Sequence, residues 1–424
     1  MPLRKLAIAF VVALCWAPAI AAPQAGFRQT QADDYTRYEL LDPASQSFRI
    51  IYDVSATTPG ATLYFNSIRP GSDPTVHGVT DRMTGRPLEW DLVSGEAAHT
   101  AGHLRANPEG QYIQVLLARA VPDGGATRVR IDKTYLDTAS YYLEGDEIVF
   151  SRTLGIKRNA VVIPAGYELT GVNYPSQIAT EPDGRIKVSF LNAGPAGVPF
   201  EVRARELSAT LERQAADPGP APLGSGASSG PDRSVARVDY RFSERAFQDR
   251  EIVYFLEQPE THSFSLYHDY TETRPGMDRY LNVVRAGSKA SQPSAKILDT
   301  GEELQVETLR GAEIVERGIE LGEVTRETEV VVIWFDPVPE GESVRLRIEE
   351  TYTDPNRYLL YGDELVWDRS FGRPLNTVVL PEGWFVTTNS IPAVLDVTDD
   401  GRVRLRYAND RPGNIDVFIK AKRR

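Results

Sequence analysis

Apolar and polar residues alternate along most of this chain. In RIKVSFLN, at 185–192, the side chains of Ile186, Val188 and Phe190 share one side, whereas VVVIWF, at 330–335, is apolar without interruption. A period of two is typical of a half-buried strand, and a short continuous apolar run is typical of a strand covered on both faces. The pattern therefore predicts many short strands, and no long stretch has the helical period.

Turn residues separate these predicted strands. Asp-Gly pairs stand between alternating segments at 183–184 and again at 400–401. Such a pair is a strong hairpin signal, because the turn needs residues that tolerate positive φ. Gly145 and Gly362 are each followed by Asp-Glu and an alternating segment, and they predict two further tight turns. Strands joined by tight turns indicate an antiparallel arrangement.

The chain contains the same unit twice. Residues 121–206 align without a gap on 338–423, with 30 identities over 86 pairs, and residues 38–95 align on 254–311, with 18 identities over 58 pairs. Chance does not hold two constant registers over such lengths. The sequence therefore indicates a tandem duplication, which has to be recognised before the fold is assigned.

The fold class that follows is all-β, with two tandem duplicated antiparallel β-sandwich units joined by a flexible linker. We place the first unit at 34–206 and the second at 236–424. The linker at 215–234 is rich in Gly, Pro, Ser and Ala and has almost nothing to bury. The two copies diverge most over 96–112 and 312–328, where we expect each unit to change from one packed layer to another.

The first residues have the order of a secretory signal peptide, which we place at 1–21. Arg4 and Lys5 carry the positive charge, Leu6–Trp16 is mostly apolar, and Ala19–Ala21 offers small residues for cleavage. The apolar part is shorter than the ~20 residues that span a bilayer. We therefore expect an exported protein, either periplasmic or extracellular.

Composition narrows the classes of function. The single cysteine, Cys15, lies inside the predicted signal, so the mature chain has no disulfide or thiol chemistry. Removing Arg4 and Lys5 with the signal leaves 45 basic and 59 acidic residues, a net charge of −14. Such a surface repels phosphate backbones, so we expect no nucleic acid partner. No later segment is apolar enough over a sufficient length to predict a transmembrane helix.

One phrase predicts a buried charge in each unit. GDEIVFSRTLG recurs 217 residues later as GDELVWDRSFG. In both copies an arginine, Arg152 or Arg369, follows two apolar residues on the same side of a strand. Because a lone buried charge is very unfavourable, each arginine needs a partner, and Asp137 and Asp354 are the expected ones. One interpretation is therefore a structural ion pair at a sheet corner.

The second interpretation is a ligand site made by these arginines with nearby acids and tyrosines. Aromatic faces beside carboxylates suit a sugar or a peptide partner. The candidate ligand-binding residues are Tyr135, Tyr141, Asp146, Glu147, Arg152, Tyr352, Tyr358, Asp363, Glu364 and Arg369. The same acids could ligate calcium, but they lack the spacing of a calcium-binding loop.

Motifs of catalysis are missing from the sequence. There is no G-x-S-x-G elbow, no phosphate-binding loop and no dinucleotide fingerprint. His99 and His103 have a spacing that could place two imidazoles on one metal, but Thr100 stands where metallohydrolases have glutamate. The surrounding segment contains Gly102, which argues against a helix there. We expect no cofactor and no bound metal.

Two segments, YELLDPASQSFRIIYD and the later TYLDTASYYLEGD, resemble the noncatalytic β-sandwich module that precedes the catalytic domain of some zinc aminopeptidases. Those enzymes carry H-E-x-x-H in a following helical domain, and that motif is absent from this sequence. The resemblance implies a β module without chemistry of its own. It assigns no role to any individual residue.

Together these observations predict an exported, noncatalytic binding or scaffolding protein of the cell envelope, with a glycan or an envelope protein as its partner. Two tethered copies could gain avidity for a repeated ligand. One alternative is a secreted or periplasmic hydrolase whose site is assembled from unobvious residues, with His99 and His103 as metal ligands. Another is a subunit of a larger envelope assembly that adds an exposed strand edge to a partner's sheet.

Overall fold

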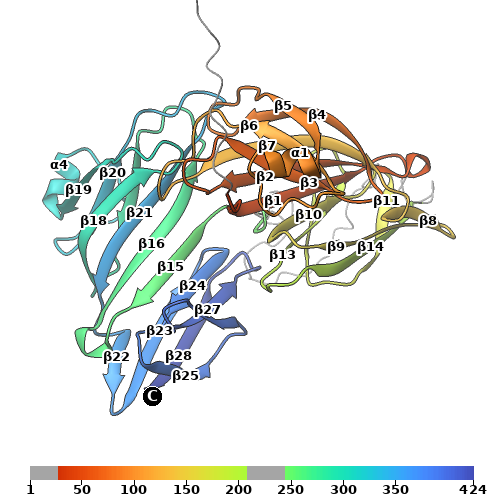
Figure 1. Cartoon of the computed structure of the whole chain (residues 1–424). Coiled ribbons are helices and arrows are strands. Elements are labelled where there is room, and N and C mark those ends of the chain that lie inside the picture. The colour runs from red at the N-terminus through yellow and green to blue at the C-terminus, as the bar shows by residue number, and fades with distance from the viewer. Residues whose placement is uncertain (1–26, 208–243) are drawn as a thin grey trace, which may run out of the picture.

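The computed structural model describes residues 27–207, here unit 1, and residues 244–424, here unit 2. The predicted signal peptide (1–21) and linker (215–234) lie outside the described residues. The described part is almost entirely β and forms six sheets in two similar halves (Figure 1). This confirms the predicted all-β fold with two tandem units.

Unit 1 is built from a seven-stranded, a four-stranded and a three-stranded sheet. In spatial order, the strands of the seven-stranded sheet are β12 (Gln177–Thr180), β13 (Ile186–Leu191), β10 (Arg158–Val162), β1 (Gln31–Leu40), β2 (Ser47–Ala56), β7 (Thr127–Leu136) and β4 (Asp73–Asp81). The four-stranded sheet contains β11 (Tyr167–Val172), β14 (Val198–Glu206), β9 (Glu147–Leu154) and β8 (Tyr141–Glu144). The three-stranded sheet contains β3 (Leu63–Ile68), β6 (Gln111–Leu116) and β5 (Trp90–Ser94).

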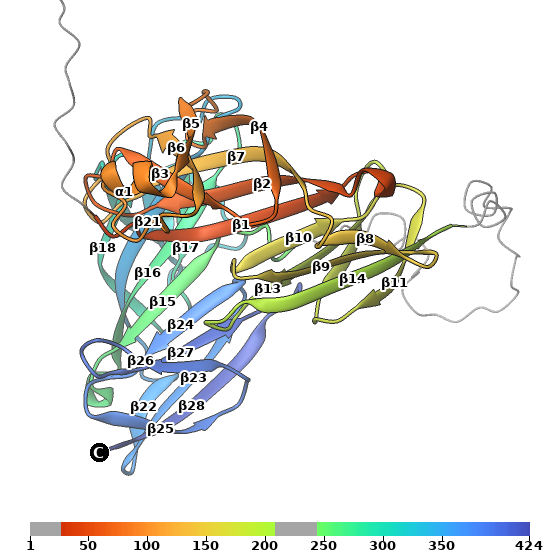
Figure 2. The same cartoon turned by 45° about the vertical axis from the view of Figure 1, so that its right-hand side comes forward.

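Unit 2 repeats the three sheets with equivalent strands in equivalent order. Its seven-stranded sheet contains β26 (Val394–Val397), β27 (Val403–Ala408), β24 (Leu375–Val379), β15 (Glu251–Leu256), β16 (Ser263–Glu272), β21 (Val344–Thr353) and β18 (Lys289–Ile297). The smaller sheets contain β25 (Trp384–Asn389), β28 (Ile415–Arg423), β23 (Glu364–Phe371) and β22 (Tyr358–Tyr361), and β17 (Arg279–Val283), β20 (Glu329–Trp334) and β19 (Gln305–Arg310). In both units the four-stranded sheet lies beside one end of the larger sheet (Figure 2).

The seven-stranded sheets are mixed rather than purely antiparallel. β1 pairs with β10 in parallel, and β15 pairs with β24 in parallel, while the other strand pairs are antiparallel. A parallel pair cannot be closed by a tight turn and needs a long connection. In unit 1, strands β2 to β9 lie between β1 and β10 in the sequence. Turn signals alone could not predict a pairing between strands this far apart.

In the described part of the chain, two short α-helices and two 3-10 turns interrupt the strands. They are α1 (Gly95–Thr100), α4 (Ala312–Glu316), η1 (Pro43–Ser45) and η2 (Pro259–Thr261). Both α-helices fall where the two sequence copies begin to diverge most, and each is too short to display a helical period. His99 lies in the last turn of α1, but the helix ends at Thr100, so the helix doubted for residues 99–103 includes His99 and not His103. None of the described helices has the length and apolar character needed to cross a membrane.

Each unit has its own hydrophobic core between the seven-stranded sheet and the two smaller sheets. The main core of unit 1 contains only residues between Tyr38 and Ala204, and that of unit 2 only residues between Ile252 and Ala421. In β20, Val331 faces this core, while Val332 packs in a second cluster beneath α4. The uninterrupted apolar run is therefore covered on both faces, as its pattern predicted.

The two units contact each other through equivalent segments. The Ala126 N–H donates to the carbonyl oxygen of Leu298 at 2.8 Å, and the Ser343 N–H donates to the carbonyl oxygen of Met83 at 3.1 Å. Positions 126 and 343 are equivalent in the sequence duplication. The contact thus approximates a twofold arrangement in which each unit offers the same surface to the other, as in an isologous dimer.

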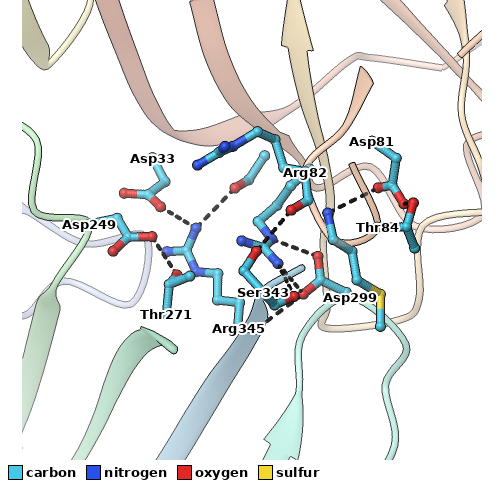
Figure 3. A network of polar contacts seen from close by, with 12 residues as sticks. Asp33, Asp81, Arg82, Thr84, Asp249, Thr271, Asp299, Ser343 and Arg345 are labelled. Atoms are coloured by element: carbon cyan, nitrogen blue, oxygen red, sulfur yellow. Dashed lines mark hydrogen bonds and ion pairs between the residues drawn. The ribbon is translucent and has the colours of Figure 1, made fainter. Parts of the chain in front are cut away.

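Buried ion pairs cross this contact (Figure 3). Arg128 donates from Nε and Nη2 to the carboxylate of Asp299 at 2.7 and 2.9 Å. The equivalent arginine, Arg345, pairs with Asp33 and donates to the hydroxyl of Ser55 at 3.0 Å. Only 5% of Arg128 and 4% of Arg345 is exposed. Arg128 therefore depends on the other unit for its counter-charge, whereas Arg345 also has Asp269 of its own unit at 3.7 Å.

We expect Asp299→Ala to lower the free energy of unfolding by about 3–5 kcal/mol, because the guanidinium of Arg128 stays buried without its carboxylate. Urea denaturation followed by tryptophan fluorescence measures this change. Asp396→Ala is the matched control, since Asp396 pairs with Arg404 on a half-exposed surface, where a pair contributes about 1 kcal/mol or less. Equal losses in the two variants would contradict a stabilising role for the pairs between units.

Candidate functional site

The ion pair predicted for unit 1 is present. Arg152 Nη1 donates to Asp137 Oδ2 at 2.7 Å, and this carboxylate also accepts from the hydroxyls of Ser72 at 3.0 Å and Ser140 at 2.8 Å. Burial raises the pKa of Asp137, but the hydrogen bonds from the two serines and the charge of Arg152 outweigh it and hold the pKa below its ordinary value. The carboxylate is therefore well compensated inside the fold.

Unit 2 has the equivalent arrangement. Arg369 Nη1 donates to Asp354 Oδ2 at 3.2 Å, and the hydroxyl of Ser288 donates to the same oxygen at 3.0 Å. The guanidinium of Arg369 lies 4.9 Å from the centre of the Phe264 ring. Both copies therefore hold the arginine predicted to be buried next to the aspartate predicted to pair with it.

The acids of the repeated phrase lie away from these arginines. Asp146 is exposed on the turn between β8 and β9, and Glu147 pairs with Arg203 of the neighbouring strand β14 at 3.3 Å. The unit 2 acids pair in the same way with lysines of β28: Asp363 with Lys422 at 3.2 Å and Glu364 with Lys420 at 2.9 Å. The structure thus does not bring the four predicted acids together with Arg152 or Arg369.

Two of the predicted tyrosines fill the cores. Tyr141 is 1% exposed and Tyr358 is fully buried. The hydroxyl of Tyr141 donates to the carbonyl oxygen of Leu41 at 2.9 Å, and that of Tyr358 donates to the carbonyl oxygen of Glu257. Burial raises the pKa of both phenols, so they stay neutral. Their position is that of packing residues with a satisfied hydroxyl.

The other two tyrosines and both arginines line cavities. Tyr135 and Arg152 border a cavity of about 710 Å³ in unit 1, and Tyr352 and Arg369 border one of about 260 Å³ in unit 2. In unit 1 the floor comes from β1, β2 and β7, and the walls come from β3 and from β9 with its following loop. The cavity therefore lies at the seam where the two smaller sheets meet over the seven-stranded sheet.

The unit 1 cavity has aromatic and cationic walls. Its aromatic residues, other than a histidine, are Tyr38, Tyr52, Tyr64, Phe65, Tyr112 and Tyr135. Its arginines and lysine are Arg69, Arg105, Lys133 and Arg152. Among the described residues that line it there is no aspartate or glutamate. The cavity lining thus presents positive charge. Carboxylates next to the lining include Asp137, which pairs with Arg152, and Asp34, which accepts a hydrogen bond from Gln31.

Lys133 is buried, unlike Arg69 and Arg105, and it lacks the carboxylate partner that Arg152 has. It is 4% exposed, and its ammonium group donates to Asn66 Oδ1 at 2.5 Å and lies 4.8 Å from the centre of the Tyr135 ring. Within the part of the chain that the structure describes, no carboxylate forms an ion pair with it. Burial lowers the pKa of Lys133 to about 7, and the positive charge of Arg152 contributes to this shift.

Lys133 is not among the residues predicted from the sequence, although the sequence carries a signal for it. Val129, Ile131, Lys133 and Tyr135 occupy alternate positions of β7, and all four are buried. A lysine at an inward position of a strand is rare unless it has a partner or a ligand. Alternation alone therefore identifies Lys133 as an unusual residue, although it does not show what lies opposite.

The two close histidines have different surroundings. His99 is exposed at the end of α1, whereas the His103 ring stacks on Phe65 with a centroid distance of 5.3 Å and an interplanar angle of 7°. Burial lowers the pKa of His103, which therefore stays neutral at pH 7. Over residues 27–207 and 244–424, no group of three or more His, Cys, Asp or Glu side chains is placed to hold a metal ion.

Comparison with known proteins gives no family. No protein-family model matches the chain, and no curated protein matches it. Among solved structures, the M1 zinc metallopeptidase from Deinococcus radiodurans is 12% identical, with a TM-score of 0.30 and a match covering 43% of each chain. An aminopeptidase N family protein from Idiomarina loihiensis is also 12% identical, with a TM-score of 0.26 over 41% of this chain and 29% of that one. Likenesses this weak assign neither a family nor a function.

We expect Asp137→Ala to lower the free energy of unfolding by about 3–5 kcal/mol at pH 7, because Arg152 loses its buried counter-charge. The folded-state pKa of Asp137 is depressed, so its stabilising effect is present above the unfolded pKa and is lost as pH falls through the folded pKa. Urea denaturation between pH 7 and pH 3 should show the gap between wild type and variant narrowing at acid pH. Asp183→Ala, at an exposed hairpin, should show a much smaller gap that changes little with pH.

A second expectation concerns Lys133→Met. The folded pKa of Lys133, about 7, lies below the ordinary lysine value of 10.5, so between these pH values the unfolded chain binds a proton that the folded chain does not. Wild-type stability should therefore rise relative to Lys133→Met from pH 7 to pH 10. Urea denaturation at several pH values measures this difference. Exposed Lys157, replaced by Met, is the control, and a Lys133→Met profile parallel to that of wild type would contradict the lowered pKa.

Proposed function

We propose that this chain is an exported, noncatalytic binding protein of the cell envelope that holds a glycan in the unit 1 cavity. The observation that carries the proposal is the cavity of about 710 Å³ at the seam of three sheets. Its size falls within the roughly 300–1,000 Å³ of small-molecule sites. Its floor belongs to rigid central strands, which suits a site that has to keep its shape.

The chemistry of the cavity wall favours a ligand rich in hydroxyl groups. Tyr64 donates its hydroxyl to Gln31 Oε1 at 2.8 Å and lies 3.3 Å from the hydroxyl of Tyr52. Asn66 and Asn107 add side-chain amides to the same lining. Amides and phenols donate and accept hydrogen bonds, as sugar hydroxyls do, while the flat tyrosine rings offer apolar surface to the faces of a sugar ring.

The same lining supports binding rather than catalysis. Glycoside hydrolysis ordinarily uses a pair of carboxyl groups about 5–10 Å apart, and the described lining residues include no aspartate or glutamate. Its histidine, His103, is stacked on Phe65 with Tyr112 against its edge, and no nucleophile in the described lining hydrogen-bonds to it. Support for export comes from the charged and apolar order of residues 1–21.

Gly155→Trp tests the proposal. Gly155 lines the cavity, and a Cβ there meets no atom within 4 Å, so a large side chain can be added at the cavity wall without straining the backbone. On an array of neutral and acidic oligosaccharides, we expect wild type to bind and Gly155→Trp to lose at least tenfold in affinity. Gly413→Trp in unit 2 is the matched control, because a Cβ there also meets open space.

Two outcomes would contradict the proposal. The first is glycan binding that Gly155→Trp leaves unchanged, which would place the site elsewhere. The second is an array without any bound glycan together with association to purified envelope proteins, which would favour the scaffolding role instead. Circular dichroism of Gly155→Trp and Gly413→Trp confirms that both variants keep the β fold before affinities are compared.

A further inference from the structure

The cavities of the two units are equivalent places that differ in the sign of the charge at one buried position. Asn66 in unit 1 corresponds to Asn282 in unit 2, and Lys133 corresponds to Glu350. Tyr135 and Arg152, with their unit 2 equivalents, complete a shared frame around both cavities. The two copies therefore share these aromatic and guanidinium groups but have opposite charges at one buried position, Lys133 in unit 1 and Glu350 in unit 2.

The asparagine next to this position forms a hydrogen bond with the lysine in unit 1 and with the glutamate in unit 2. Asn66 accepts a hydrogen bond from the ammonium of Lys133 through Oδ1, whereas Asn282 donates from Nδ2 to Glu350 Oε2 at 2.7 Å. An amide can do both, because it has a donor end and an acceptor end. The strand geometry is thus equivalent in the two units, and the difference lies in the charge that each cavity offers.

The charge balance of the two cavities differs in consequence. In unit 2, Glu350 shares its cavity with Arg369, Arg373 and Arg285, so negative and positive groups are both present. In unit 1, the described lining residues are cationic or neutral, and Lys133 has an amide oxygen but no counter-charge. A buried ammonium without a counter-charge is unfavourable. An anion bound in the cavity would supply the counter-charge that the ammonium group of Lys133 lacks.

We propose that the unit 1 cavity binds an acidic sugar, with its carboxylate or phosphate group beside Lys133 and its hydroxyl groups against the tyrosines and amides of the wall. This inference rests on the proposed glycan-binding function and specifies its ligand class. A uronic acid and a sugar phosphate share the chemistry that Lys133 recognises, namely an oxyanion on a polyhydroxylated ring. The unit 2 cavity, smaller and already holding a carboxylate, does not share this preference.

Calorimetry with defined probes tests the inference. At pH 6, where Lys133 is protonated, the full mature chain is titrated with glucuronate, glucose 6-phosphate and glucose at constant ionic strength. We expect at least one of the two anions to bind tenfold or more tightly than glucose, and the better of the two identifies carboxylate or phosphate as the natural group. Lys133→Met should remove that advantage, while the affinity for glucose should change less than threefold.

Matched variants separate a charge effect from a folding effect. Glu350→Gln changes the equivalent residue of unit 2 and should leave the preference for the anion unchanged. Lys133→Gln keeps a hydrogen-bond donor for Asn66 without the charge, so it should lose the preference as Lys133→Met does while retaining the wild-type circular dichroism spectrum. Loss of the preference in Glu350→Gln, or its survival in Lys133→Gln, would overturn the inference.

The results also distinguish the inference from the function on which it rests. If glucose binds as tightly as both anions and Gly155→Trp abolishes that binding, the preference for an anion is wrong and the glycan site stands. If no probe binds but the array yields a neutral glycan that is sensitive to Gly155→Trp, the inference again fails alone. If no glycan binds in either experiment, both proposals fail together.

Discussion

A charge that is removed from water inside a β fold needs an opposite charge close by, and this constraint organises the whole molecule. Arg152 satisfies it within unit 1 through Asp137. Arg128 and Arg345 satisfy it across the contact between the units. Lys133 has an amide oxygen and an aromatic ring but no carboxylate partner in the described structure, and it lines the unit 1 cavity of about 710 Å³.

The duplication has two structural consequences, one at the contact between the units and one inside each unit. Where the units touch, equivalent segments contact each other, so the relative placement of the units depends on buried ion pairs and backbone hydrogen bonds as well as on the chain that joins them. Two ligand sites on this protein would therefore be held at a defined separation, which limits the repeated ligands that both could engage at once. Within the units, the tyrosine and arginine that line each cavity are the same in both copies, whereas position 133 is a lysine and the equivalent position 350 is a glutamate.

The position of the cavity follows from the architecture. Two separate small sheets cover one face of the seven-stranded sheet in each unit, and in unit 1 the cavity lies between strands of these small sheets and β1, β2 and β7 of the large one. Side chains pack less closely where two separate sheets adjoin than between two facing sheets, so a cavity can form at this seam. Tyr135 and Lys133 lie beneath it because alternate residues of β7 point toward the smaller sheets.

The strands, their inward faces and the pairing of Arg152 with Asp137 could be predicted from the sequence, because they depend on local periodicity and on the intolerance of buried charge. The duplication followed from aligning the sequence with itself. The parallel pairing of β1 with β10, the ion pairs between units and the pairing of Glu147 with Arg203 became known only from the folded chain. A period of two states which side of a strand is buried, but not which distant strand covers it. That missing partner decides whether an inward residue meets a packed core or, as Lys133 does, an open cavity.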